Sequence, residues 1–355
     1  MGLAVPAAFY VLSASLASAV AAGEPALVRM TPPVGSEPII VVNSAETEKD
    51  ARVDAMTLAR AVAAAQADPR DNVIRFDPRT FSAGGATVPL AAAIVVRRST
   101  GGHDCIDGSL PAGEITLDGS GCAEAAVAVE GDGRLSLKNV AIAGPVAHGV
   151  ICKGNGRLFL KCVTLRGSDG PGLALFDSAT ATLSECLATG NRTHGIELHG
   201  RSSILLNDTA LAGNGQSGLA AFDAANAAVK RSRASSNGDW NLILSQESQV
   251  RWEDGYLARS RFAQADVSGS AALTVTGSTL EDGGRFGIFT TGQARVRVVG
   301  SRISGHGSRG IELQDNARLV LETTTVESSG DYGLLLFGRS RLTAKGCIFA
   351  ANGAH

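Results

Sequence analysis

The chain has 355 residues, of which 44% are hydrophobic and 5% aromatic, and it contains 43 glycines. This hydrophobic share excludes a chain that is disordered throughout, and abundant glycine with few aromatic rings is typical of short strands joined by tight turns. The formal net charge of −2 favours neither nucleic acid nor a membrane surface as a partner.

An apolar run followed by small residues opens the chain. The run ends in Ala19-Val20-Ala21, which fits the A-x-A cleavage site of a secretory signal peptide, although no Lys or Arg precedes it. We therefore expect residues 1–21 to be removed and the mature protein to be secreted, periplasmic or displayed at the cell surface. A retained N-terminal hydrophobic anchor is the alternative. No later apolar run approaches the length of a membrane-spanning helix, so no membrane contact is expected after cleavage.

Residues 22–124 are expected to form a cap and irregular first strands before a regular repeat begins. Asp54 is placed to cap a helix that carries Leu58, Val62 and Ala65 on one apolar face. Such a helix would cover the open end of the first coil, whose backbone groups are otherwise unpaired. Irregular strands are predicted at the segments NVIRF (72–76), IVV (94–96) and ITLDG (115–119).

The six cysteines of the chain do not predict a metal site. Cys105 and Cys122 flank a short loop, and a disulfide between them after export is left open. The other four lack the C-x-x-C spacing of metal ligands and are expected to fill space in the wall of the fold; they are Cys152, Cys162, Cys186 and Cys347. We predict no metal and no other cofactor.

A repeat of 23 residues covers positions 125–354 without an insertion. Its marker is a glycine at the second position of most units, found at Gly149, Gly172, Gly195, Gly218, Gly287, Gly310 and Gly333. The ten units start at residues 125, 148, 171, 194, 217, 240, 263, 286, 309 and 332. A fixed period of this length is the signature of a solenoid.

Within each unit the hydrophobic pattern has the period of a strand rather than that of a helix. The third position is apolar in every unit, and the eleventh, thirteenth, sixteenth and eighteenth positions form further columns of apolar or small residues. Turns rich in Gly, Asn and Asp separate these segments, as in GNG at 213–215. Three short strands and three turns per unit predict one coil of a parallel β-helix, in which identical positions stack about 4.8 Å apart.

The repeat resembles the right-handed parallel β-helix proteins of the pectin-lyase-like superfamily. The resemblance covers residues 125–354, and the upstream segment 54–81 is similar to the LREAI…AN…I-x-F segment that precedes the helix in secreted members. It implies an all-β fold, a right-handed parallel β-helix of ten 23-residue coils with an N-terminal capping helix.

The stretch HGIELHG at 194–200 places polar groups on the outer face of one coil. The third and fifth residues of a unit point inward, so the second, fourth and sixth point outward, which sets Glu197 beside His199. Phe176 and Phe222 hold the sixth position in the coils on either side. Aromatic faces beside polar groups suit sugar rings. We expect these two rings to contact substrate, together with Asp177, Asp223, Arg201 and Lys153, the last about 10 Å from His199 along the stack.

The same stretch resembles the reactive coil of alginate C5-epimerases and related lyases, which reads Tyr-Gly-Phe-Asp-Pro-His. The resemblance places His194 at the tyrosine, Glu197 at the aspartate and His199 at the histidine, and it implies that these three residues are catalytic. That chemistry needs a carboxylate to hold or neutralise a uronate, a base that removes the C5 proton, and an acid that returns it or protonates the leaving group. Glutamate, leucine and histidine here replace aspartate, proline and tyrosine.

Other columns of polar residues leave alternatives open. The segment RGIELQD at 309–315 repeats Gly-Ile-Glu-Leu without a histidine, so a plain solvated surface remains an alternative for HGIELHG. Asp266 and Glu312 lie in the fourth column on either side of Phe289, about 10 Å apart, near the spacing of an inverting glycosidase pair.

Two further columns lie in the other turns and strands. Arg295, Arg318 and Arg341 stack in the tenth column with Arg297 beside them, and an acidic polysaccharide or local pairing with Glu322 or Asp315 would relieve their repulsion. A side-chain amide ladder is predicted in the last turn for Asn191, Asn214, Asn237 and Asn352. The GHG at 305–307 is placed on a turn and assigned no catalytic role.

Two functions from different classes follow. The first is an exported protein that engages an acidic polysaccharide, with polysaccharide lyase or uronate C5-epimerase activity if it is an enzyme. The second is a non-catalytic, adhesin-like surface or structural rod, which the uniform period without long loops favours. The chain stops at ANGAH (351–355) in the last turn of the tenth coil, so we expect either a partner on that coil, most simply a second copy, or a truncated reading frame.

Overall fold

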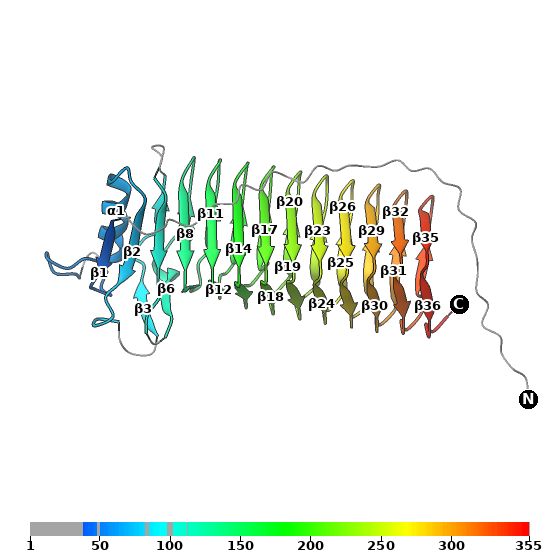
Figure 1. Cartoon of the computed structure of the whole chain (residues 1–355). Helices are drawn as coiled ribbons and strands as arrows, with labels where there is room; N and C mark the ends of the chain where they lie inside the picture. The colour runs from blue at the N-terminus through cyan, green and yellow to red at the C-terminus, as the bar shows by residue number, and fades with distance from the viewer. Residues whose placement is uncertain (1–37, 48–49, 82–84, 98–101, 112, 355) are drawn as a thin grey trace, which may run out of the picture.

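The computed structural model describes residues 38–47, 50–81, 85–97, 102–111 and 113–354 and shows a stack of parallel strands in three sheets (Figure 1). Sheet 1 contains β4 (Ile94–Val96), β7 (Ala125–Val129), β10 (His148–Cys152), β13 (Leu173–Leu175), β16 (Ile196–Leu198), β19 (Ser217–Ala221), β22 (Trp240–Leu244), β25 (Ala263–Val267), β28 (Phe286–Thr290), β31 (Arg309–Leu313) and β34 (Leu334–Leu336). Sheet 2 contains β1 (Ile39–Val42), β2 (Asn72–Phe76), β5 (Asp104–Asp107), β8 (Arg134–Lys138), β11 (Arg157–Lys161), β14 (Thr180–Ser184), β17 (Ser203–Asn207), β20 (Asn226–Lys230), β23 (Gln249–Glu253), β26 (Ala272–Thr276), β29 (Arg295–Val299), β32 (Arg318–Glu322) and β35 (Arg341–Lys345). Sheet 3 contains β3 (Ala86–Pro89), β6 (Ile115–Asp118), β9 (Val140–Ala143), β12 (Thr164–Arg166), β15 (Leu187–Thr189), β18 (Ala210–Ala212), β21 (Arg233–Ser235), β24 (Tyr256–Ala258), β27 (Thr279–Glu281), β30 (Arg302–Ser304), β33 (Thr325–Glu327) and β36 (Ile348–Ala350).

The register of these strands confirms the predicted right-handed parallel β-helix. Val127, Val150, Leu173 and Ile196 pair in sequence across four neighbouring strands of sheet 1, and each is 0% exposed. One hydrophobic core runs through the stack from Val42 to Val326. Since every coil repeats the same inward columns, each strand buries its apolar side chains against the coils before and after it.

Each coil turns at three corners, and one residue at each corner has a left-handed backbone. The seventh, fifteenth and twentieth residues of every unit have positive φ. Gly, Asn and Asp adopt this conformation at the lowest cost, which explains why they fill the turns. Gly200 shows the requirement, because a Cβ there would lie 2.8 Å from the carbonyl oxygen of Asp177 in the previous coil.

The α-helix α1 (Leu58–Ala67), the only one within the described residues, covers the N-terminal end of the stack beside β1 and β2 (Figure 1). Its buried face holds Leu58, Val62 and Ala65 as predicted, and Ala61 as well. The cap residue is Thr57 rather than Asp54, because Thr57 directly precedes the first helical residue and its side chain accepts a hydrogen bond from the Arg60 N–H.

The strands predicted upstream of residue 125 are present as β2, β4 and β6. Three more, β1, β3 and β5, join the same sheets, and a short 3₁₀ turn η1 (Gly119–Gly121) follows β6. The coils therefore begin before the regular repeat does. The predicted signal peptide, residues 1–21, lies outside the described residues. Among the residues that are described, no helix has the length and apolar character of a membrane span.

No disulfide joins Cys105 to Cys122. Cys122 belongs to the hydrophobic core, whereas Cys105 is adjacent in β5 to the core residue Ile106 and so faces the opposite side of its sheet. Cys152 and Cys186 fill the core as expected, and burial raises the pKa of each thiol to about 12.

The amide ladder is confirmed in three consecutive coils. Asn191 donates to the Oδ1 of Asn214 over 2.9 Å, and Asn214 donates to Asn237 over 3.0 Å. Asn237 continues to Asn241 over 2.7 Å. The expectation that the second column faces outward is wrong, because Asn241 is 0% exposed and turns toward this ladder. Asn352 lies apart from these three and accepts the Ser329 N–H over 3.0 Å.

His306 takes the ladder position in its own coil. Its Nδ1 accepts the Gly283 N–H over 3.0 Å, and burial lowers its pKa to about 4. The imidazole is therefore a structural acceptor, in agreement with the turn predicted for GHG.

Replacing His306 by asparagine is expected to make the protein less sensitive to acid. The unfolded imidazole takes up a proton below about pH 6.5 and the folded one only below about pH 4, so the free energy of unfolding falls as the pH drops between these values, by up to about 3 kcal/mol. Asparagine supplies the same acceptor without titrating. Urea unfolding at pH 4 and pH 7 measures the difference, and His148→Asn on the surface is the control. If wild type and His306→Asn lose the same free energy of unfolding between pH 7 and pH 4, the assignment is contradicted.

The tenth coil pairs on one side only among the described residues. Several of its apolar side chains are exposed as a result: Leu336, Phe337, Leu342, Ile348 and Phe349. Docking of a partner or second copy onto this coil stays a prediction.

Candidate functional site

The predicted cluster assembles on the outer face of sheet 1. Glu197 lies in β16 and His199 directly follows this strand, and both side chains point outward and are half-buried. The His199 ring is stacked between Phe176 and Phe222, with ring centroids 5.2 Å and 5.1 Å away. The three rings share one column of the repeat, so the strand spacing brings them into contact.

Contacts at both ring nitrogens fix the orientation of His199, and one of these contacts holds the Glu197 carboxylate. Its Nε2 lies 2.7 Å from the Glu197 Oε1, and its Nδ1 lies 3.7 Å from the Asp223 Oδ2. With both ring faces covered by phenyl groups and both nitrogens directed at carboxylates, the imidazole has little left to offer a ligand. We therefore assign His199 to positioning the Glu197 carboxylate.

The two aspartates at the turn edge are part of the corner itself. Asp177 and Asp223 have φ values of 58° and 55°, and each carboxylate accepts a backbone N–H from the previous coil over 2.8 Å, from Gly154 and Gly200 respectively. The Gly200 N–H, followed by the Gln246 side chain and His199, lowers the pKa of Asp223. These carboxylates stabilise the turn on which the cluster is built.

The two predicted cations are not brought to the cluster. The Lys153 Nζ lies 2.7 Å from the Glu124 Oε1, and this hydrogen bond lowers the pKa of Glu124. Lys153 directly follows β10, the strand two coils before β16. Arg201 is exposed at the corner, where its backbone N–H donates to the carbonyl oxygen of Asp177 over 2.6 Å.

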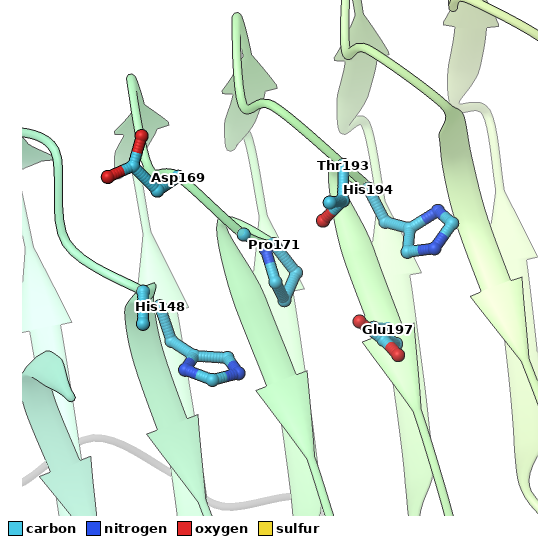
Figure 2. Close-up of a pocket in the computed structure, with 8 residues that line it drawn as sticks. His148, Asp169, Pro171, Thr193, His194 and Glu197 are labelled. Atoms are coloured by element: carbon cyan, nitrogen blue, oxygen red, sulfur yellow. The ribbon is translucent and has the colours of Figure 1, made fainter.

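A hollow of about 360 Å³ opens beside Glu197. It is lined by Ala147, His148, Asp169, Gly170, Pro171, Thr193, His194 and Glu197, from the starts of the sheet 1 strands and the turns before them (Figure 2). Figure 2 shows the imidazoles of His148 and His194 on either side of Pro171, with Glu197 below His194. His148 and His194 share the first column of the repeat two coils apart, which is about 10 Å.

The sequence analysis missed His148, Asp169 and Thr193 as site residues. For His148 a signal was present, since the alignment of units places it in the same column as His194. No comparable pattern marks Asp169 or Thr193, which lie in turns before the strands.

Burial lowers the pKa of His194, against a smaller opposing effect of Glu197. The Nδ1 of His194 is buried and has no hydrogen-bond partner among the described residues, and the ring meets Phe222 edge to face at 6.5 Å. Burial therefore favours the neutral imidazole of His194 at the edge of the hollow, the form in which histidine accepts a proton.

The second carboxylate pair does not form a glycosidase centre. Glu312 is buried, forms an ion pair with Arg309 and accepts a hydrogen bond from the Gln314 Nε2 over 2.6 Å. Its oxygens are thus occupied. Asp266, across Phe289 in the register of sheet 1, is half-buried.

Local pairing accounts for part of the arginine cluster. Arg297 lies 2.8 Å from Glu322, whereas Asp315 accepts the Gly292 N–H over 2.9 Å. Arg295, Arg318 and Arg341 are in register and exposed. Within the described part of the chain, no group of three or more His, Cys, Asp or Glu side chains is arranged to hold a metal ion.

Sequence comparison matches the whole of the regular repeat to a known family model. A model described as the right handed beta helix region matches residues 125–259 and 241–355. No curated protein sequence matches the chain.

Several solved structures share the fold at low sequence identity. The A-module of the mannuronan C-5 epimerase AlgE4 of Azotobacter vinelandii superposes with a TM-score of 0.68 at 13% identity, covering 83% of this chain and 91% of the module. The periplasmic alginate epimerase AlgG has a TM-score of 0.52 at 12% identity, covering 77% and 84%. Tailspike protein 3 of bacteriophage CBA120 has a TM-score of 0.53 at 14% identity, covering 87% and 61%.

Proposed function

This chain belongs to the right-handed β-helix family, and we propose that it binds an acidic polysaccharide on the outer face of sheet 1 and moves a proton at C5 of a bound uronate. The observation that carries the proposal is the hollow between His148 and His194, with the Glu197 carboxylate held beside it by His199. Surface carboxylates and imidazoles are ordinary, but here two imidazoles and the Glu197 carboxylate line one depression.

The two histidines suit proton transfer on opposite faces of a sugar ring. They stand about 10 Å apart across Pro171, which leaves room for one ring between them. His194, whose burial favours the neutral form, takes the C5 proton. In an epimerase His148 then gives a proton to the other face of C5. In a lyase the electron pair of the C–H bond forms the C4–C5 double bond, the bond from C4 to its oxygen breaks, and His148 protonates that oxygen.

Glu197 is the group that faces the uronate carboxylate. The lining of the hollow contains no Lys or Arg, so contact between Glu197 and a uronate needs a shared proton to offset their repulsion. A shared proton withdraws charge from the uronate and makes its C5 proton more acidic. The bond to His199 sets the direction in which the Glu197 carboxylate points.

The comparisons support the substrate class. The two epimerases among the similar structures act, by their names, on mannuronan and on alginate, which are uronate polymers. At 12–13% identity they share the fold, so the catalytic roles rest on the residues of this chain. Action outside the cytoplasm agrees with the predicted signal peptide and belongs to the same proposal.

A non-catalytic, adhesin-like rod is the second candidate function. The uniform coils favour it, because the ten units carry no inserted loop to wall off a substrate from water. A binding protein of this kind needs the aromatic surface around His199 but not the two histidines of the hollow.

Incubation with a panel of uronate polymers in D₂O tests the proposal. We expect deuterium at C5, detected by NMR, whether the product is epimerised or cleaved, and ultraviolet absorbance of a C4–C5 double bond if it is cleaved. His148→Gln and His194→Gln should each abolish the uptake, with the exposed turn residue change Glu247→Gln as the control. Calorimetric binding without deuterium uptake would identify a binding protein, and the absence of both would favour the rod.

A further inference from the structure

Asp266 is a carboxylate on the same outer face that the proposed chemistry does not use. It lies in β25, and neither of the neighbouring strands, β22 and β28, carries a titratable side chain. In register beside it are Ile243 and Phe289. Burial alone raises its pKa to about 6, and no described side chain pairs with it. A carboxylate that is desolvated without a partner lowers stability, and such groups concentrate at functional sites.

Phe289 presents a fixed aromatic surface next to this carboxylate. Its ring is half-buried and stacked on Phe286 at 5.1 Å, and Phe286 itself is 1% exposed. The guanidinium groups of Arg285 and Arg309 lie 5.0 Å and 5.9 Å from the Phe286 ring and hold that ring from its other sides. An aromatic ring held in this way keeps its orientation before a ligand arrives, which reduces the entropic cost of binding.

The position of Asp266 relative to Glu197 follows from the strand order. Sheet 1 runs β16, β19, β22, β25, so the two carboxylates are three strands apart, about 14 Å. Between them the fourth column holds only Ala220 and Ile243, which are uncharged. A polysaccharide that occupies the hollow and continues along the axis of the helix passes over Asp266 and Phe289.

We propose that Asp266 and Phe289 form a second sugar-binding position, which takes a uronate ring further along the same acidic chain. The proposal rests on the proposed function of the hollow. Phe289 stacks on the face of the ring, and Asp266 in its protonated form donates a hydrogen bond to the uronate carboxylate. Ionised Asp266 repels that carboxylate, so the position is occupied at a pH where the proton is retained.

The test compares short and long oligouronates at two pH values. A disaccharide is too short to reach both positions, and a decasaccharide spans them. The ratio of the two affinities, measured by calorimetry, reports the second position once it exceeds the statistical factor, which is the number of registers in which a decasaccharide can present a disaccharide unit to the hollow. In wild type we expect this ratio to exceed the statistical factor clearly at pH 5 and to fall toward it by up to about tenfold for each pH unit above 6.

Three variants test whether Asp266 and Phe289 cause the difference between the two affinities. Asp266→Asn keeps a hydrogen-bond donor without a charge and should hold the ratio constant from pH 5 to pH 8. Phe289→Ala should bring the ratio close to the statistical factor at every pH. Glu247→Gln, an exposed carboxylate on the turn after β22, is the control and should behave as wild type.

The outcomes separate this proposal from the one on which it rests. If the disaccharide binds and the ratio is unchanged in Phe289→Ala, or its pH dependence persists in Asp266→Asn, the second position is wrong while the hollow stands. If neither oligosaccharide binds wild type, both proposals are wrong.

Discussion

Replacing Glu197 by glutamine is expected to lower turnover of a uronate polymer by about a hundred- to a thousandfold, the range typical of losing one group that stabilises the charge that develops in the transition state. Glutamine keeps the shape of the side chain and its contact with His199, but it cannot share a proton with the uronate. Since Glu197 points outward and is half-buried, we expect the melting temperature to change little. The rate of deuterium incorporation at C5 measures the effect, and Glu247→Gln serves as the control.

Two variants of His199 test whether it acts by orienting the Glu197 carboxylate. His199→Ala removes the group that orients the carboxylate and should lower kcat more than it raises KM, because the aromatic surface for the sugar remains. His199→Gln retains a donor toward Glu197 and should recover part of the rate. If Glu197→Gln keeps full activity, HGIELHG is an ordinary surface segment without a catalytic role.

The largest loss of stability is expected from Trp252→Ala. Trp252 is 0% exposed inside β23, at a position filled by smaller residues in the other coils, such as Val229 and Val275. Removing the indole leaves a cavity in a core that neighbouring coils cannot close, and we expect the free energy of unfolding to fall by about 3–5 kcal/mol. Urea unfolding followed by circular dichroism measures the loss. Trp240→Ala, half-buried on the outer face, should lose less.

A double variant tests why the indole fits. Gly255 lies where a Cβ would be 2.3 Å from the Trp252 Nε1, whereas the coils on either side have Ser232 and Ser278 in that column. Gly255→Ser alone should therefore destabilise the protein. Combined with Trp252→Leu it should destabilise less than it does alone, with a coupling energy of about 1–3 kcal/mol; part of the loss should persist, because a Cβ at position 255 would also lie 2.7 Å from the Ser232 carbonyl oxygen. Strictly additive effects would show that the glycine is not required by the indole.

The repeat by itself was sufficient to predict which residues neighbour each other along the stack. A strand alternates strictly between two faces, and a constant 23-residue period allows one register. For this reason the position of His199 between Phe176 and Phe222 was available from the sequence, as was the amide ladder beginning at Asn191. The same reasoning identified the alternation of inward and outward residues around Glu197.

The 23-residue period does not predict the direction of a side chain that turns away from the other members of its column. The sequence predicted a sugar contact for Asp177 and Asp223, which stays a prediction, but it did not predict that each carboxylate accepts a backbone N–H at the left-handed corner. Lys153 pairs with Glu124, which lies in the turn before the regular strand. Asn241, in the second column, turns toward the ladder rather than outward.

The hollow itself was decided only by the tertiary structure. His148 and His194 are separated by two coils and belong to strand ends, where the turn before each strand sets the direction of the side chain. Whether two such rings face a common depression depends on the path of that turn and on small residues such as Gly170 between them. Column positions follow from hydrogen-bonded strand pairing, which the sequence period reports, whereas the direction of a side chain at a turn depends on local torsion angles that no period encodes.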